Sequence, residues 1–368
     1  MPLPVYLCGG SYDCAQGRSG EPNLFSHPDA AFRPPQPQTV SALGSRQALP
    51  YFKAFAPDLL TLPDLCRLAE AHILAAAEDA GWLPEELAHI PLFIGSTSYV
   101  MSDREARQTA HGPHTRYAFD QIAGYLKQRF GHPNVFSFAT SCTSSAQALV
   151  AAAQTVANGF SPRALVLGFE SFNRMTFEHF HAMHLLAEHS GRLPFQQVDG
   201  MILGEAAACV ALRAQTARAY QARLLGPIGQ TDCHSLTASS EAPLRRLLAD
   251  CLRAAGLSSS DLCAVKTHGS GGSSDDIEAA VLADLLPEVP AILLKPYTGH
   301  TLGATAALES ALLLHALRRG SLPALPGKHA THPNLPTLHG RTLDNGAYLH
   351  YFLGFGGSHS AWVLDWQT

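Results

Sequence analysis

The chain is predicted to fold as an α/β protein with a mainly parallel sheet, built from two similar halves. Apolar strand-like segments alternate with helical segments throughout the 368 residues, which is typical of parallel pairing. Two segments, around Cys142 and His300, share one plan: a short strand, a tight turn with a reactive side chain, and an Ala-rich helix. This similarity favours two halves related by a pseudo-twofold axis, with Cys142 and His300 facing each other near the middle.

The elements follow from the hydrophobic pattern of each segment. In the first half we expect strands at 5–7, 90–94, 135–140, 164–167 and 203–212, and helices at 65–80, 116–130 and 146–156. In the second half we expect helices at 243–255, 276–286 and 303–317, and strands at 264–267, 291–294, 347–353 and 360–364. The first strand should stop at Gly9-Gly10, 135–140 should be buried, and 203–212 should form one long central strand. Residues 26–37 and 322–342 are rich in proline and indicate loops.

Composition excludes several classes of protein. With 46% hydrophobic and 15% charged residues, the chain is globular rather than disordered. A net charge of −5 argues against general nucleic-acid binding. The eight cysteines are scattered and form no CxxC pair, so neither a zinc ribbon nor a disulfide framework is indicated. No signal peptide and no membrane span are recognisable, and a reducing, cytoplasmic setting is expected.

Cys142 stands where a strand passes almost directly into a helix. The turn Ser141-Cys142-Thr143-Ser144-Ser145 contains neither Gly nor Pro. Free backbone N–H groups and the positive end of the helix dipole should favour a thiolate at such a helix start. The sequence therefore predicts a cysteine nucleophile on a sharp turn. The alternative is a buried cysteine that behaves as a small hydrophobe.

Two histidines occupy comparable places in the second half. His268 and His300 each follow a predicted strand and lie beside glycine or small residues, which let substrate or backbone approach closely. Most single histidines are structural, but this placement favours function. A thiolate and two imidazoles suit acyl transfer to sulfur followed by carbanion chemistry, in which neutral imidazoles donate N–H bonds to an enolate or move a proton.

Four segments resemble the signatures of the β-ketoacyl-acyl-carrier-protein synthases, in the family's order. They are TSCTSSAQAL, KTHGSGGSSDDIE, LKPYTGHTLGATAALE and GFGGSHSA, and the region LGFESF to MILGEAA resembles the family's linking region. The resemblance covers roughly residues 90 to 365. It implies the thiolase-like five-layer αβαβα fold of two pseudo-repeated halves, usually dimeric. We expect residues 1–215 to form the half that carries the nucleophile and residues 216–368 the half that carries both histidines.

The resemblance also implies roles for individual residues. Cys142 resembles the acyl-accepting nucleophile, and His268 and His300 resemble the pair that assists malonyl decarboxylation and stabilises the enolate. The Cys-His-His set resembles chain-elongating synthases; initiating members would show Asn in place of the second histidine, and thiolases a second cysteine. No metal and no organic cofactor are implied.

Further residues match around this set. Lys295 matches the lysine ahead of the second histidine, and Glu309 the acidic residue thought to pair with it. Phe355 resembles the gating phenylalanine of the GFGG turn, which also contains Gly356. The backbone N–H groups of Phe355 and Cys142 would make the oxyanion hole.

The sequence also departs from the family pattern. The chain is shorter than typical members, the region between residues 96 and 136 looks compressed, and the opening is VYLCGGSYDCAQG. Asp276 falls where the family's aspartate stands, Glu278 comes one residue early, and Ser358-His359 replaces the usual Thr-Asn. Divergent short synthases of aryl polyene pigment pathways resemble this chain; there they act as condensing enzymes or as chain-length partners.

Other polar groups favour structural roles. Glu178, His179, His181 and His184 share one predicted helix, and a polar surface or interface is favoured over a metal site because no HExxH pattern accompanies them. Residues 95–98 favour a strand-end turn near the site over a phosphate loop, and 354–357 do not form a dinucleotide fingerprint. The candidates for meeting an acidic carrier protein are Lys127, Arg129, Arg213, Arg218 and Arg223, for each of which scattered solvated charge is the competing interpretation.

The sequence thus predicts an elongating β-ketoacyl-acyl-carrier-protein synthase. It would condense an acyl thioester with malonyl-ACP through an acyl-Cys142 intermediate, in fatty-acid or polyene/polyketide synthesis. Its expected partners are acyl carrier protein and a second ketosynthase-like chain, in a homodimer or heterodimer. The rivals are a non-catalytic chain-length-factor subunit, against which Cys142, both histidines and Lys295 argue, and a thioester hydrolase on the same fold.

Overall fold

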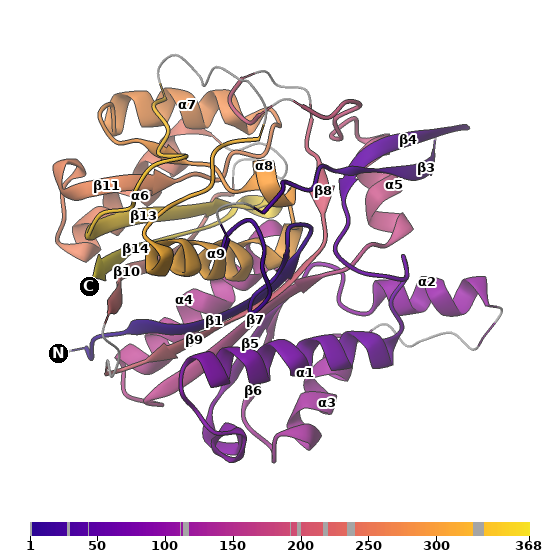
Figure 1. Cartoon of the computed structure of the whole chain (residues 1–368), viewed down its shortest axis with the longest axis horizontal. Coiled ribbons are helices and arrows are strands. Elements are labelled where there is room, and N and C mark those ends of the chain that lie inside the picture. Colours follow the sequence, from indigo (N-terminus) through magenta and orange to yellow (C-terminus); the bar gives the residue numbers. More distant parts are fainter. Residues whose placement is uncertain are drawn as a thin grey trace.

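Within the described residues, the fold is built around a long mixed sheet of eleven strands, ten of which form two halves of five strands each (Figure 1). The computed structural model describes residues 2–27, 30–42, 44–110, 112, 118–191, 193–196, 200–215, 220–233, 240–326 and 335–368. The first half contains β1 (Tyr6–Cys14), β5 (Leu92–Gly95), β6 (Val135–Phe138), β7 (Arg163–Glu170) and β9 (Ala206–Arg213). The second half contains β10 (Gln221–Thr231), β11 (Leu262–Lys266), β12 (Ala291–Ile292), β13 (Gly346–Leu353) and β14 (Ser358–Gln367).

The two halves repeat one strand order, which confirms the prediction of two similar halves. The order is β6-β5-β7-β9-β1 in the first and β12-β11-β13-β14-β10 in the second, and the halves meet where Tyr6 pairs with Arg223. The outer three strands of each half are parallel, whereas β9 and β14 are antiparallel to both neighbours. The expectation of mainly parallel pairing is therefore wrong. A tight turn without a crossover helix joins β13 to β14, and such a connection requires antiparallel strands.

Helices form three layers around the two halves of the sheet. The outer layers contain α1 (Leu62–Asp79) and α3 (Asp120–Arg129) on one side, and α6 (Glu241–Ala255) and α7 (Ser274–Leu285) on the other. The middle layer contains α4 (Ser144–Ala157) and α9 (Thr305–Arg319), which pack on each other between the halves. Their small side chains let the layers approach closely, and most of α9 is fully buried. This is the predicted αβαβα arrangement (Figure 1).

The two central helices begin in the same way. Each follows a single 3₁₀ turn, Ser141–Thr143 before α4 and Leu302–Ala304 before α9. The first residue of each turn has a positive φ, 55° at Ser141 and 45° at Leu302. The two helix starts meet, because Ser145 Oγ accepts hydrogen bonds from the backbone N–H groups of Ala306 (3.1 Å) and Ala307 (3.2 Å).

The first strand does not stop at Gly9-Gly10, contrary to the prediction. Strand β1 continues through both glycines to Cys14. A Cβ at Gly9 would lie 2.6 Å from the carbonyl oxygen of Ala76 in α1, and one at Gly10 would lie 3.5 Å from Ala311 in α9. These glycines therefore allow helices to pack closely on both faces of a central strand, which is a different role from breaking it.

Residues 203–212 do not form one strand either. The segment divides at Glu205 into β8 (Leu203–Gly204) and β9, and β8 belongs to a separate small sheet with β3 (Gln36–Ala42) and β4 (Ser45–Phe52). The buried carboxylate of Glu205 accepts hydrogen bonds from the backbone N–H groups of Ala54, Phe55 and Phe172. These bonds hold the small sheet beside the large one.

Strand β6 is not buried, contrary to the prediction. It is the last strand of its half, and Phe136 is 47% exposed. The ring of Phe136 stacks on Phe93 of β5 with a centroid separation of 5.0 Å. Pairing on one side only leaves an apolar sheet edge open to solvent.

The other predicted elements are found with shifted ends. The helix predicted from residue 116 is α3, while residues 116 and 117 lie outside the described part. Residues 30–35, 322–326 and 335–342 contain no helix or named strand, and residues 28, 29 and 327–334 of the same predicted loops are not described. The pattern missed β2 (Gly17–Arg18), β3, β4, β10 and α2 (Met101–Thr109). No helix in the described ranges has the length and apolarity that a bilayer crossing requires.

Candidate active site

Cys142 lies in the turn between β6 and α4, as the sequence predicts. Ser144 holds this turn together: its Oγ accepts the backbone N–H of Thr140 (3.0 Å) and donates to the carbonyl of Ser141 (2.7 Å). Cys142 is 5% exposed and belongs to an apolar cluster that includes Phe172, Phe177 and Leu302. The thiol therefore faces a nonpolar chamber rather than open solvent.

The expectation of a ready thiolate is wrong for this structure. Burial raises the pKa of the Cys142 thiol to about 12, and the carboxylate of Glu170 raises it further. Hydrogen bonding to the backbone of Phe355 and the positive charge of Lys295 act in the opposite direction but do not overcome desolvation. The resting thiol is protonated at neutral pH, so its reaction must include removal of the proton.

His268 and His300 come together from different segments. His268 follows β11, and His300 follows the short helix α8 (Lys295–Thr298); their ring centroids lie 5.3 Å apart with planes at 89°. The backbone N–H of His300 donates to the carbonyl of Ile202 at 2.7 Å, and its Nδ1 lies 3.4 Å from the hydroxyl of Thr305. Burial holds the pKa of both imidazoles well below 6.5, and Lys295 adds to the effect. Both rings are therefore neutral at neutral pH.

Two buried carboxyl groups shape the loop after His268. Glu278 Oε2 accepts the backbone N–H groups of His268 (3.1 Å) and Gly269 (3.0 Å), and the hydroxyl of Tyr351. Asp275 accepts the backbone N–H groups of Ser270, Gly271 and Phe195. Burial raises the pKa of Asp275 to about 6 and that of Glu278 to about 8.

The expected match at Asp276 is corrected by this geometry. Asp276 is exposed, and the inward-facing aspartate is Asp275. Asp275 and Glu278 are both displaced by one residue from the expected positions, so their mutual spacing on α7 is preserved. A helix turn separates them, which places both carboxyl groups on the face toward the loop.

Lys295 and Glu309 form the predicted pair. Lys295 Nζ lies 3.0 Å from Glu309 Oε1 and donates to the backbone carbonyl of His268 at 2.5 Å. The lysine thus connects helix α9 with the loop that carries the first histidine. Sequence reasoning missed a second ammonium group here. Lys266, the last residue of β11, is fully buried, and its Nζ lies 2.6 Å from Glu309 Oε2.

Lys266 also contacts a backbone carbonyl and an aromatic ring. Its Nζ donates to the carbonyl of Tyr351 (3.1 Å) and lies 3.5 Å from the ring centroid of Phe352. Burial lowers the pKa of Lys266 to about 8, even though Glu309 opposes the shift. The available sequence signal was a lysine at the end of an apolar strand, two residues before His268.

Phe355 occupies a 3₁₀ turn, Phe355–Gly357, between β13 and β14. Its ring stacks on that of Phe180, with centroids 6.0 Å apart and planes at 13°. The turn is joined to the cysteine turn by the hydroxyl of Thr143, which lies 2.8 Å from the hydroxyl of Ser358. Gly356 is exposed with φ 80°. The arrangement places the backbone of Phe355 near the thiol while its side chain rests on α5 (Arg174–Ala182).

The other polar groups that the sequence singled out are not part of the site formed around Cys142, His268 and His300. Within the described residues, no three His, Cys, Asp or Glu side chains are grouped as a metal site would require. The predicted helix α5 ends at Ala182, so His184 lies outside it, contrary to the prediction, and has φ 57°. His181 of α5 lies 3.2 Å from Gln47 of β4, which fits an internal contact. Ser96, Thr97 and Ser98 bind the carboxylate of Glu170, as a strand-end turn beside the site would.

The basic residues proposed to meet a carrier protein differ in their exposure and pairing. Arg129 pairs with Glu70 at 2.6 Å, while Lys127 and Arg223 are exposed and Arg213 is partly exposed. Arg218 lies outside the described residues.

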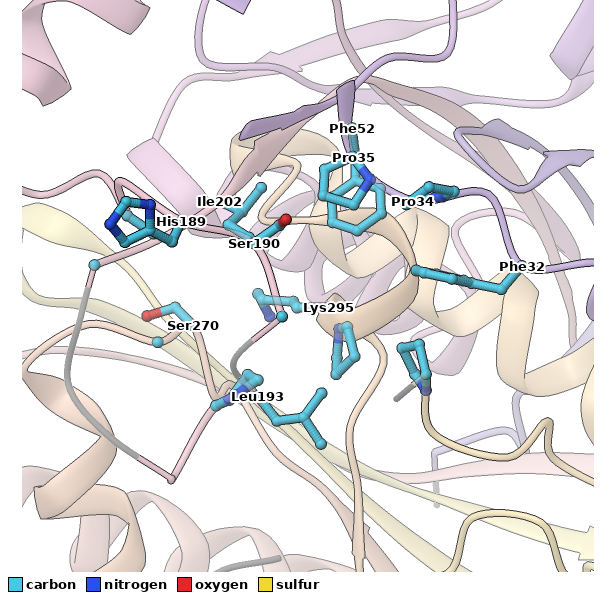
Figure 2. Close-up of a pocket in the computed structure, with 17 residues that line it drawn as sticks. Phe32, Pro34, Pro35, Phe52, His189, Ser190, Leu193, Ile202, Ser270 and Lys295 are labelled. Atoms are coloured by element: carbon cyan, nitrogen blue, oxygen red, sulfur yellow. The ribbon is translucent and has the colours of Figure 1, made fainter. Parts of the chain in front are cut away.

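A cavity of about 220 Å³ lies beside the histidine-bearing segments (Figure 2). Lys295 and Ser270 reach it from those segments, and Phe32, Pro35 and Phe52 form much of the opposite wall. Cys142 does not line this cavity. The cavity therefore borders the supporting lysine rather than the thiol.

Comparisons with known proteins match most of the chain to one family. Residues 25–217 match the family model described as β-ketoacyl synthase, N-terminal domain, and residues 227–328 match the C-terminal domain of the same family. The chain is 26% identical over 344 residues to 3-oxoacyl-[acyl-carrier-protein] synthase 2 of Rhizobium meliloti (strain 1021), covering 81% of this chain and 80% of that protein.

Solved structures share the fold at low sequence identity. A chain in the complex of the ketosynthase ApeO with its chain length factor ApeC, from Xenorhabdus doucetiae, has a TM-score of 0.79 at 20% identity, covering 99% of this chain and 98% of that one. A chain in a complex of a type II polyketide synthase acyl-carrier protein with its hexaketide-bound ketosynthase has a TM-score of 0.81 at 18% identity, covering 99% and 100%.

Proposed function

The chain belongs to the β-ketoacyl synthase family, and from this premise we propose that it catalyses decarboxylative Claisen condensation of an acyl thioester with malonyl-ACP. The observation that carries the proposal is the edge-to-face pair of neutral imidazoles, His268 and His300, 5.3 Å apart. Cys142 lies on the neighbouring helix start, where the two central helices meet.

Acyl transfer is the first step. The sulfur of Cys142 attacks the thioester carbonyl, a new carbon–sulfur bond forms, and the bond to the carrier's sulfur breaks. Because the resting thiol is protonated, its proton must leave as the bond forms; we assign its acceptance to the neutral His300 and its delivery to the departing carrier thiolate. The backbone N–H groups of Cys142 and Phe355 would stabilise the oxyanion.

Condensation follows in the same chamber. Carbon dioxide leaves the malonyl group, and the electron pair of the broken carbon–carbon bond passes to the thioester oxygen as an enolate. The imidazole N–H groups of His268 and His300 would hold this oxygen. The enolate carbon then attacks the acyl carbonyl, the bond to Cys142 breaks, and a β-ketoacyl thioester remains on the carrier. The departing Cys142 thiolate takes up one proton from solvent, which regenerates the thiol.

Partners are proposed from the same family relationship. The proposed substrates arrive on acyl carrier protein, and the complexes among the structural relatives support a second ketosynthase-like chain. The exposed edge strand β6, with Phe136, gives such a chain an apolar surface to cover. We also propose the division into halves at residues 215 and 216, and a cytoplasmic location, in keeping with eight cysteines that are all described and all free.

A second candidate function is a chain-length-factor subunit that pairs with an active ketosynthase. One observation favours it: Cys142 is 5% exposed and is surrounded by packed aromatic side chains. A thiol that never opens to a substrate would give the chain a structural role in a heterodimer.

Acylation of the purified chain separates the two candidates. The protein and its Cys142→Ala variant are incubated with acyl-ACP and then malonyl-ACP, alone and with a ketosynthase partner, and intact mass and β-ketoacyl product are measured. The condensing enzyme should gain one acyl group only when Cys142 is present. Cys66→Ala, which removes another buried thiol in α1, is the matched control. Condensation that needs the partner and is indifferent to Cys142 supports the second candidate, and release of free acid without malonyl consumption indicates a hydrolase.

A further inference from the structure

A buried carboxylate lies beside the cysteine turn. Glu170 is the last residue of β7 and is 3% exposed. The hydroxyl of Ser98 donates to its Oε2 at 2.6 Å, and its Oε1 accepts the hydroxyl of Ser96 at 3.3 Å and the backbone N–H of Thr97. All of these donors are neutral, so they favour the ionised form of Glu170 without cancelling its charge.

Glu170 is connected to the starts of both central helices. Thr97, whose backbone N–H binds Glu170, also donates its hydroxyl to the carbonyl of Ser141 at 3.3 Å, and Ser141 directly precedes Cys142. On the other side lies Gly303, in the turn before α9, where a Cβ would come within 2.7 Å of Glu170 Oε1. The carboxylate therefore lies where the turns before α4 and α9 meet.

This position changes the charge balance at the two helix starts. The positive ends of the α4 and α9 dipoles favour a nearby anion, and a thiolate could have been that anion. Glu170 already supplies a buried negative charge there, and it repels a second one on the sulfur of Cys142. Its effect adds to burial, while the ammonium group of Lys295 acts in the opposite direction.

The other titratable groups near the sulfur are uncharged at neutral pH. Tyr51 of β4 belongs to the same buried cluster as Cys142, and burial holds its pKa well above 10. Burial likewise keeps His268 and His300 neutral by lowering the pKa of each ring. Among the described residues, Glu170 is thus the acidic group whose charge bears on this thiol.

We propose that Glu170 is a positioning residue for the nucleophile, which fixes the cysteine turn against the start of α9 and opposes negative charge on the Cys142 sulfur. The nucleophile therefore rests as a thiol, which protects it from alkylating and oxidising reagents between turnovers. The importance of this role for acyl transfer rests on the proposed function, because it presumes that Cys142 is the nucleophile. The repulsion itself does not depend on which acyl group is transferred.

The test compares wild type and Glu170→Gln in their reaction with methyl methanethiosulfonate, a small uncharged reagent that attacks thiolates. The rate of Cys142 labelling is followed by peptide mass between about pH 5 and pH 9. At the alkaline end the Gln variant should react on the order of tenfold faster, because its amide does not repel a thiolate. The ratio of the two rates should fall toward one as the pH falls through the pKa of Glu170, which burial raises above 4.5, because the wild-type carboxyl is then also neutral.

The matched control is Glu205→Gln, which neutralises another buried carboxyl group. Glu205 binds the backbone N–H groups of Ala54, Phe55 and Phe172 instead of the turn at 96–98, so this variant should label Cys142 at a rate close to that of wild type. The buried thiols of Cys66 in α1 and Cys251 in α6 report on the fold, because they react only if the structure opens.

The outcomes separate this inference from the proposed function. Equal labelling rates of wild type and Glu170→Gln at every pH overturn the inference. A ratio above one that does not change with pH, or labelling of Cys66 and Cys251 as well, reveals a loosened structure and also overturns it. Acylation by acetyl-ACP is measured in parallel. If neither protein is acylated although the pH-dependent difference in labelling is present, the proposed function fails and the electrostatic role of Glu170 is supported.

Discussion

The ammonium group of Lys266 lies 2.6 Å from Glu309 Oε2, and both side chains are buried. The other carboxylate oxygen of Glu309, Oε1, lies 3.0 Å from the ammonium group of Lys295. One carboxylate therefore faces two ammonium groups, and the cluster carries an excess positive charge beside His268 and His300. Both lysines lower the pKa of each imidazole. The same charge favours an enolate that develops at the histidines.

Replacement of Lys266 should alter the pH dependence of decarboxylation. Since the pKa of Lys266 is about 8, its charge is present below that pH and is lost above it. Wild-type malonyl-ACP decarboxylation should therefore decline above pH 8, whereas Lys266→Met should lack this alkaline limb and have a lower rate at neutral pH, by roughly tenfold. The pH profile of carbon dioxide release measures both effects.

Several titratable groups near Lys266 have to be considered in that profile. Glu309, Lys295, Glu278, His268, His300 and His350 surround it from the neighbouring elements. Arg67→Met removes an exposed positive charge from α1 and is the matched control. If the Lys266 variant keeps the wild-type alkaline limb, another group causes it and the role of the second lysine is refuted.

Glu278 offers a separate test through stability. The pKa of this buried carboxyl is raised from 4.5 to about 8, so the native state binds its proton more tightly than the unfolded state does. Its contribution to stability is complete below pH 4.5 and is lost as the pH rises through 8. Glu278→Gln keeps an acceptor and has no such proton. Wild type should therefore lose stability relative to the Gln variant as the pH rises across this range, as measured by urea unfolding.

A leucine at the same position should be costly at every pH. Glu278→Leu leaves the backbone N–H groups of His268 and Gly269 without their acceptor, which should cost about 1–3 kcal/mol of stability for each buried group.

The Gln variant also gives the outcome that would contradict the raised pKa of Glu278. If the stabilities of wild type and Glu278→Gln change in parallel with pH, Glu278 is ionised in the native protein.

The parts of the site that the sequence could predict are contiguous in the chain. The turn around Cys142 and the turns that carry His268 and His300 were recognisable because each contains its own strand end, small residues and helix start. The alternating elements predicted the α/β class, whereas the five layers were implied only by the resemblance of the motifs.

The missed parts depend on contacts between distant segments. Lys266 and Glu309 are 43 positions apart in the sequence, and no local sequence pattern predicts that they pair. The low reactivity expected of the resting thiol arises from burial in an apolar cluster that includes side chains of β3, β4 and α5. The sequences of β3 and β4, QPQTVSA and SRQALPYF, are too polar to read as strands. The sequence could not show which of the neighbours Asp275 and Asp276 points inward. That depends on which face of α7 packs against the protein, and tertiary contacts decide it.

Two neighbouring glycines should respond very differently to alanine. At Gly357, which has φ 73°, a Cβ would lie 1.7 Å from the carbonyl oxygen of Asp232, so the turn that carries Phe355 could not form. At Gly356, which has φ 80°, no atom lies within 4 Å of an added Cβ, and only backbone strain of about 1–2 kcal/mol is expected. Gly357→Ala should abolish condensation while Gly356→Ala retains it. Equal activity of the two variants would contradict the turn geometry.

The stack of Phe355 on Phe180 should control access of water to the acyl-enzyme. The rings lie nearly parallel with centroids 6.0 Å apart, and such a pair contributes about 0.5–1.5 kcal/mol beyond its buried area. Phe180→Ala removes the ring on which the proposed gating residue Phe355 stacks. Water should then reach acyl-Cys142 more often, so the thioester should hydrolyse several-fold faster in the absence of malonyl-ACP. The half-life of the acetylated protein, followed by intact mass, measures this. Met175→Ala changes an exposed residue of the same helix and is the control. An unchanged half-life in the Phe180 variant, with the control also unchanged, would mean that Phe355 closes the site without this support.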